Sequence, residues 1–128
     1  MSCEKNEEVL QSPAKEPVVY EEGITLKTTN WSYYSSGVPT YRTFWLSPGS
    51  FSMTIDNAGN RDAIISVYPR TSSTIDYGNR MDIFTMACGL NYCIFKYYSL
   101  PSGYTGIYVE VRKASPTGGY VSGTISVS

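Results

Sequence analysis

The segment SFSMTID (residues 50–56) alternates polar and apolar side chains at every position. Successive side chains of a β-strand point to opposite faces, so Phe51, Met53 and Ile55 would share one face and the polar side chains the other. One apolar face and one polar face are typical of strands in antiparallel sheets that pack against each other. The segment therefore predicts an all-β protein built as an antiparallel β-sandwich.

Segments of this kind follow one another along most of the chain, separated by Gly, Pro, Asn and Ser. This spacing predicts about eight strands in a jelly-roll-like sandwich that forms one domain over residues 18–128. The candidate segments are VVY (18–20), ITLKTT (24–29), YRTFWL (41–46), SFSMTID (50–56), AIISVY (63–68), MDIFTM (81–86), CIFKYYS (93–99), IYVEVRK (107–113) and YVSGTISV (120–127).

Residues 1–17 show no hydrophobic period and are rich in Glu, Lys, Asn and Pro, which predicts a disordered, flexible polar linker. Within it, Cys3 follows the small residue Ser2 and precedes an acidic run. This resembles the processed start of a bacterial lipoprotein, if Met1 stands in place of a removed signal peptide. The resemblance implies a diacyl anchor on Cys3 and a place outside the cytoplasm. The alternative is a cytosolic protein with an incidental cysteine near its N-terminus.

The composition includes twelve tyrosines and no histidine. Tyrosine favours pleated, half-buried surfaces, which again indicates β-structure. The absence of histidine excludes Ser-His-Asp and Cys-His catalysis within one chain and removes the usual ligand of catalytic zinc. Asp76 and Asp82 share one irregular stretch, and we interpret them as solvated charges rather than the paired carboxylates of a glycosidase. We therefore expect a non-enzymatic protein without a cofactor.

The charge of the chain bears on whether its partner is a nucleic acid or a membrane. The net charge is −1 and no basic stripe is concentrated in the sequence, which argues against a nucleic-acid partner. No apolar run approaches the roughly 18 residues that would span a bilayer. The expected membrane contact is therefore the lipid anchor alone.

Cys88 and Cys93 lie close together in MACGLNYCIF (86–95). If GLNY were the turn of a hairpin, the two side chains would face each other at a distance suited to a disulfide. Buried free thiols are the alternative. The C-x₄-C spacing does not fit a redox pair, and two further zinc ligands are lacking.

The segment DNAGNRD (56–62) places Asp56, Asn60 and Asp62 at alternating positions, as in part of a calcium loop. An EF-hand would require glycine after Asn60 and an acid at its twelfth position, and neither is present. Asn and Gly tolerate positive φ, so NAGN is interpreted as a hairpin turn.

The stretch TTNWSYYSSGVPTY (28–41) combines large rings with Ser, Gly and Pro, which is typical of a loop. Aromatic rings on a loop can stack on sugars or anchor a protein partner. Two rings on the following strand could extend such a surface. The alternative is that these rings cover the end of the sandwich and are buried. The candidate binding residues are Trp31, Tyr33, Tyr34, Tyr41 and Trp45.

Two segments run Leu, Pro, Gly, aromatic residue and then an alternating strand: LSPGSFSMTI (46–55) and LPSGYTGIYVEV (100–111). Together with the final GGYVSGTISVS, they resemble the pre-peptidase C-terminal domains of secreted bacterial proteins, which are small β-sandwiches. The resemblance implies an accessory or binding module. Those domains often carry the segment Asp-Ala-Asp-Leu-Tyr. In this chain Asp62 and Ala63 are followed by Ile64 instead of the second aspartate, so the resemblance does not extend to the cation site associated with that segment.

These features favour a non-enzymatic, lipid-anchored module that recognises another protein at the cell surface. Such a module could serve as an immunity or exclusion factor or as an accessory subunit. The alternative is a carbohydrate-binding module that uses the same aromatic rings for a polysaccharide. An enzyme of unfamiliar mechanism is the third possibility.

Overall fold

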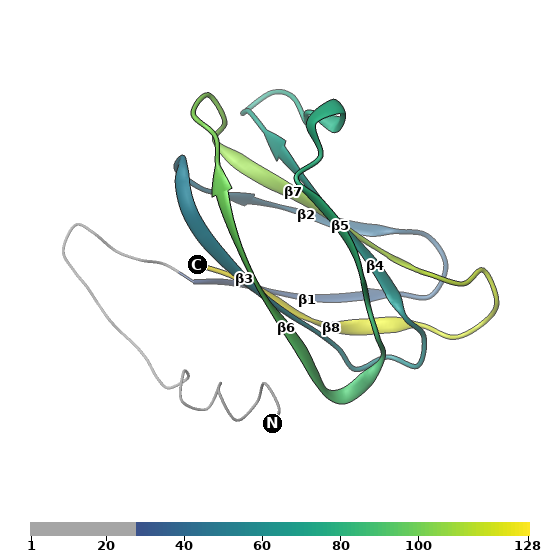
Figure 1. Ribbon diagram of the computed structural model, residues 1–128. Coiled ribbons are helices and arrows are strands. Elements are labelled where there is room, and N and C mark those ends of the chain that lie inside the picture. Colours follow the sequence, from purple (N-terminus) through teal and green to yellow (C-terminus); the bar gives the residue numbers. More distant parts are fainter. Residues whose placement is uncertain (1–27) are drawn as a thin grey trace.

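The computed structural model describes residues 28–128 of the protein (Figure 1). The predicted linker over residues 1–17, with Cys3, lies outside the described residues, and so do the segment at 18–20 and residues 24–27 of the segment at 24–29. The described chain forms eight strands and one short 3₁₀ turn, η1. Their bounds are β1 Thr29–Ser35, β2 Thr40–Trp45, β3 Gly49–Asn57, β4 Ala63–Arg70, η1 Tyr77–Asn79, β5 Asp82–Met86, β6 Gly89–Leu100, β7 Gly106–Lys113 and β8 Val121–Val127.

The strands form two four-stranded antiparallel sheets that pack as two layers (Figure 1). Sheet I has the order β1-β8-β3-β6, and sheet II has the order β2-β7-β4-β5. Consecutive strands lie in different sheets except for β4 and β5, and this alternation is that of a jelly roll. The predicted antiparallel sandwich is therefore confirmed. No helix in residues 28–128 is long and apolar enough to cross a bilayer.

The core lies between the two sheets, where the inward positions of the strands meet. The alternation predicted for residues 50–56 is confirmed, since Phe51, Met53 and Ile55 of β3 are all buried. Burying apolar surface of this kind is the main favourable term in folding. The largest fully buried side chains are Met53, Ile55, Ile65, Met86, Leu100, Ile107, Ile125, Val67, Val109, Val111, Val121 and Val127.

Two predicted hairpins are wrong, because the strands that each hairpin would join lie in different sheets. NAGN follows β3 and leads to β4, but β3 pairs with β6 and β8, while β4 pairs with β5 and β7. GLNY lies inside β6 rather than at a turn, because β5 ends at Met86 and β6 begins at Gly89. Gly and Asn mark where a chain changes direction, but they do not determine which strand it pairs with next.

Asn57 holds both of these crossovers. Its side chain is completely buried at the end of β3. The amide Nδ2 donates to the carbonyl oxygens of Arg61, at 2.8 Å, and Met86, at 3.1 Å, and Oδ1 accepts the Gly59 N–H at 3.0 Å. One side chain thus connects the end of β3, the following loop and the end of β5. Buried polar groups are normally hydrogen-bonded in this way, because leaving them unpaired is costly.

Tyr33 and Asp56 join β1, β3 and β8. The Tyr33 hydroxyl donates to the Asp56 carbonyl oxygen at 2.5 Å, and Asp56 Oδ1 accepts the Thr124 N–H at 2.9 Å. Burial, and secondly the Asp56 charge, raise the pKa of Tyr33 well above its ordinary value. Tyr33 therefore remains a protonated hydrogen-bond donor.

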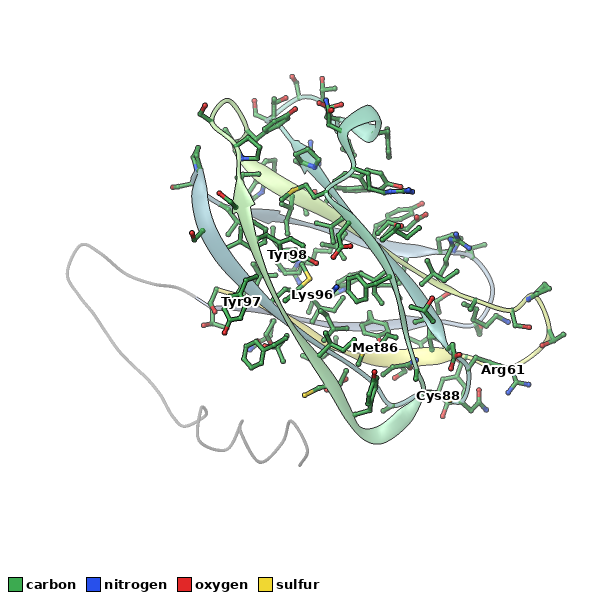
Figure 2. All side chains as sticks on the ribbon, in the orientation of Figure 1. Arg61, Met86, Cys88, Lys96, Tyr97 and Tyr98 are labelled. Atoms are coloured by element: carbon green, nitrogen blue, oxygen red, sulfur yellow. The ribbon has the colours of Figure 1, made fainter. Side chains whose placement is uncertain are left out.

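The edges of the two sheets meet where β5 lies beside β6. Lys96 Nζ lies 3.3 Å from Asp82 Oδ2 and 4.3 Å from the centroid of the Phe84 ring. The Tyr98 hydroxyl donates to the same Asp82 oxygen at 2.8 Å, and burial is the main reason why the pKa of Tyr98 is raised. Figure 2 shows Lys96 and Tyr98 on the opposite side of β6 from Tyr97. The three polar groups therefore close this edge of the sandwich.

Candidate functional site

The aromatic stretch predicted as a loop is mostly a strand, and this prediction is wrong. Residues 29–35 form β1, which pairs with β8 along its length. Tyr33 is buried, and Trp31 is half-buried against Phe44, with 6.3 Å between the ring centroids. The outward positions of β1 carry mainly small polar residues such as Asn30 and Ser32, and these residues produced the loop-like composition.

The five predicted binding residues are divided among three places. Trp31 and Tyr33 face the core, which agrees with the alternative prediction that these rings are buried. Tyr34 lies on the outer face of sheet I, where its ring stacks on Tyr120 with 5.7 Å between centroids. Tyr41 and Trp45 occupy outward positions of β2 in sheet II.

Tyr41 and Trp45 belong to a larger group of rings on the outer face of sheet II. Tyr41, Trp45 and Tyr77 are 53%, 59% and 60% exposed, whereas the rings beneath them are half-buried. Pairing of β2 and β4 with the central strand β7 brings these segments together from distant parts of the sequence. We call this surface the aromatic face, and its residues are Tyr41, Trp45, Tyr68, Tyr77 and Tyr108.

Four of the rings contact one another. Tyr108 stacks on Tyr41, with 5.4 Å between centroids and 29° between planes, and meets the edge of Tyr77 at 6.3 Å and 88°. Tyr77 in turn packs edge-on against Tyr68 at 5.0 Å and 71°. Stacked and edge-to-face arrangements are the favourable ones for aromatic pairs. The tyrosines therefore support one another through ring contacts within the aromatic face.

Arg70 holds the fifth ring. Its guanidinium lies 4.9 Å from the centroid of the Trp45 ring, and Nη1 donates to Thr43 Oγ1 at 2.8 Å. Gly106 lies between Arg70 and Trp45 in the sheet. A Cβ on Gly106 would lie 3.0 Å from the Trp45 ring and 2.7 Å from the Phe44 carbonyl oxygen. Glycine at this position therefore allows the indole to lie close to β7.

The aromatic face carries hydrogen-bond donors and a cation rather than reactive groups. Burial, followed by the neighbouring Tyr77 and Tyr41 hydroxyls and the Glu110 carboxylate, raises the pKa of Tyr108. Its hydroxyl is therefore protonated at neutral pH. Residues 28–128 contain no group of three or more His, Cys, Asp or Glu side chains that could hold a metal ion. The surface is suited to recognition by ring contacts, hydroxyl groups and the Arg70 charge.

The two acids considered for hydrolysis are engaged by different partners. Asp76 lines an open depression of about 470 Å³ beyond the end of β4. Its Oδ2 accepts bonds from Asn79 Nδ2, at 2.9 Å, and the Tyr104 hydroxyl, at 2.5 Å, and these bonds lower its pKa. Asp82 begins the edge strand β5 and is bound by Lys96 and Tyr98. The lowered pKa of Asp76 does not suit a general acid, and the two carboxylates have separate partners.

The predicted bond between Cys88 and Cys93 is wrong, because Cys88 has a free, exposed thiol. Cys88 lies before β6, and its N–H donates to Asp62 Oδ1 at 3.2 Å. Cys93 lies within β6 and pairs with Asp56 of β3. The disulfide was predicted from a hairpin that the chain does not form.

Four residues at this surface were not predicted as binding residues: Tyr68, Arg70, Tyr77 and Tyr108. Tyr108 stands at a polar position of the alternating segment 107–113, so its outward direction could be predicted. The register that pairs it with Thr43 and Tyr68, and brings its ring onto Tyr41, could not be predicted. Tyr77 reaches the sheet from η1, and no periodic pattern marks that contact.

No protein-family model and no curated protein matches the sequence. Among solved structures, the fold is similar to PliG of Aeromonas hydrophila, a periplasmic inhibitor of g-type lysozyme. The TM-score is 0.54 at 18% identity, over 88% of this chain and 92% of that chain. A CBM36-1 domain of a multidomain xylanase from the hindgut metagenome of Trinervitermes trinervoides gives a TM-score of 0.45 at 11% identity, over 81% of this chain and 86% of that chain. The likeness to PliG establishes a shared fold.

Proposed function

We propose that this protein is a non-enzymatic binding module that holds another protein against its aromatic face, outside the cytoplasm. The observation that carries the proposal is the solvent-facing set of rings that pack on one another, with Arg70 beside Trp45. Trp, Tyr and Arg are the residues that contribute most to protein–protein affinity. Rings that are ordered before binding lose little conformational entropy in a complex. The fold shared with a periplasmic lysozyme inhibitor is consistent with this role and location.

The proposal is tested by removing the two most accessible rings of β2. Trp45→Ala combined with Tyr41→Ala should weaken binding of the partner by at least tenfold, because hot-spot truncations cost about 2 kcal/mol or more. Both side chains are more than half exposed, so the fold should be retained. The measurement is quantitative retention of cell-envelope proteins of the native host on the immobilised chain. A g-type lysozyme is the first purified partner to test, by both binding and inhibition.

The matched control is Phe95→Ala with Tyr97→Ala, which removes two exposed rings from sheet I. A specific partner should be retained equally by the wild type and by this control. Retention that is the same for all three proteins would contradict recognition through the aromatic face. So would the absence of any retained protein.

We also propose that Cys3 carries the lipid anchor, on the strength of the polar linker that follows it. The protein expressed from its own gene in the native host should be found in the membrane fraction with the mass of a diacylglyceryl group added at Cys3. Cys3→Ser should release it, since acyl chains supply the membrane affinity. An unmodified mass, or a membrane-bound Cys3→Ser variant, would exclude this anchor.

A further inference from the structure

A second surface lies on the outer face of sheet I, on the opposite side of the sandwich from the aromatic face. Pairing between strands places its residues in rows that run across the sheet. Thr54 of β3 has Ser126 of β8 on one side and Phe95 of β6 on the other. In the neighbouring row, Ser52 pairs with Tyr97, and its backbone exchanges two hydrogen bonds with Ser128. We call this surface the hydroxyl face.

Each row ends on β6 at an exposed ring. Phe95 and Tyr97 are 54% and 78% exposed, with 5.9 Å between their centroids and 5° between their planes. Figure 2 shows Tyr97 projecting away from the sandwich. Neither ring contributes to the core. Adjacent exposed aromatic side chains of this kind are typical of a binding surface rather than of a surface that only faces water.

The hydroxyl face carries almost no charge. The outward positions of β1, β3, β6 and β8, all within the described chain, include no Lys or Arg and a single acid, Asp56. Asp56 Oδ1 already accepts the Thr124 N–H. A polyanion or a strongly charged protein surface would find no complementary charges here. The ligand that fits is therefore neutral and polar.

The combination of hydroxyl groups and flat rings matches the chemistry of a sugar chain. Sugar rings present C–H faces that pack on aromatic rings and hydroxyl groups that exchange hydrogen bonds with Ser and Thr. Neighbouring strands lie roughly 5 Å apart, so the rows offer hydroxyl groups at a regular interval across the sheet. A flat, open sheet is suited to an extended polymer rather than to a small enclosed ligand.

We propose that the hydroxyl face binds a neutral polysaccharide, which packs on Phe95 and Tyr97 and is hydrogen-bonded by the hydroxyl rows. This site is separate from the aromatic face and does not depend on the function proposed for it. Because the two surfaces lie on opposite sides of the sandwich, both could be occupied at once. The protein would then connect a polysaccharide to a protein partner.

The test is native gel electrophoresis of the full chain through gels that contain galactomannan, xyloglucan, mixed-linkage β-glucan or the anionic polygalacturonate. At least one neutral polymer should retard the wild type, and polygalacturonate should not. Phe95→Ala with Tyr97→Ala should weaken the interaction by about tenfold, as expected for two ring contacts. Thr54→Val, which keeps the side-chain shape and removes the hydroxyl, should weaken it about threefold.

The control is Trp45→Ala with Tyr41→Ala, which should be retarded like the wild type. Circular dichroism establishes that each variant is folded. The proposal is overturned if no neutral polymer retards the wild type, if polygalacturonate alone does so, or if the Phe95 and Tyr97 variant is retarded equally. It is also overturned if sedimentation shows a dimer that this variant abolishes while polysaccharide binding is absent, since the face would then bind a second copy.

Discussion

Asn57→Ala should lower the free energy of unfolding by about 3 kcal/mol, because the substitution removes a hydrogen-bond partner from three backbone groups at a largely buried site. The Arg61 and Met86 carbonyl oxygens lose their Nδ2 donor, and the Gly59 N–H loses its Oδ1 acceptor. Asn57 is completely buried, and polar groups left unpaired at such a site cost more than exposed ones. Domains are stable by only about 5–15 kcal/mol, so a loss of this size is a large part of the total. Urea denaturation followed by tryptophan fluorescence measures it.

Two further substitutions separate the hydrogen bonds from other effects. Asn57→Asp keeps an acceptor for Gly59 but loses both donors and buries a charge, so it should also be strongly destabilising. Asn30→Ala removes an exposed asparagine whose Oδ1 accepts one bond from Ser126 Oγ, and should change the free energy of unfolding by less than about 0.5 kcal/mol. If Asn57→Ala were as stable as Asn30→Ala, the side chain could not be what holds the two crossovers.

The layers of the sandwich could be predicted because the core requires apolar side chains at every second position. Phe51, Met53 and Ile55 in β3 satisfy this requirement, and so do the inward residues of β7 and β8. The alternation is harder to recognise in β1, where the polar Ser35 is buried and the large ring of Tyr34 points outward. Period two is present there as well, but the serine content masks it.

Pairing between strands could not be predicted, and both candidate surfaces depend on it. Tyr108 and Tyr68 are forty residues apart and become neighbours only because β4 pairs with β7. Phe95 and Thr54 become neighbours only because β3 pairs with β6. The same gap explains the wrong disulfide, since the Cys88 prediction depended on a hairpin between strands that lie in different sheets. Local composition indicates strands and turns, whereas pairing is decided by how the whole core packs.

Gly123→Ala should lower the free energy of unfolding by about 3 kcal/mol, because it combines overpacking with the loss of two hydrogen bonds. A Cβ at this position would lie 2.4 Å from both the carbonyl oxygen and Oδ1 of Asp56. Neither oxygen can move freely, since the first accepts the Tyr33 hydroxyl and the second accepts the Thr124 N–H. Gly123 does not have a positive φ, so the effect is steric rather than conformational. Chemical denaturation again measures the change.

Gly37→Ala is the matched control, because a Cβ there meets no atom within 4 Å and its φ is not positive. This substitution should leave the free energy of unfolding unchanged or raise it by a few tenths of a kcal/mol, because alanine lowers the conformational entropy of the unfolded chain. A double-mutant cycle with Tyr33→Phe sharpens the test. Both substitutions act on the same Asp56 carbonyl oxygen. The double mutant should therefore lose less free energy of unfolding than the two single mutants lose in total. If the two losses of free energy were fully additive, the methyl group would be accommodated without disturbing Asp56. The contact between β3 and β8 would then not depend on the space left by Gly123.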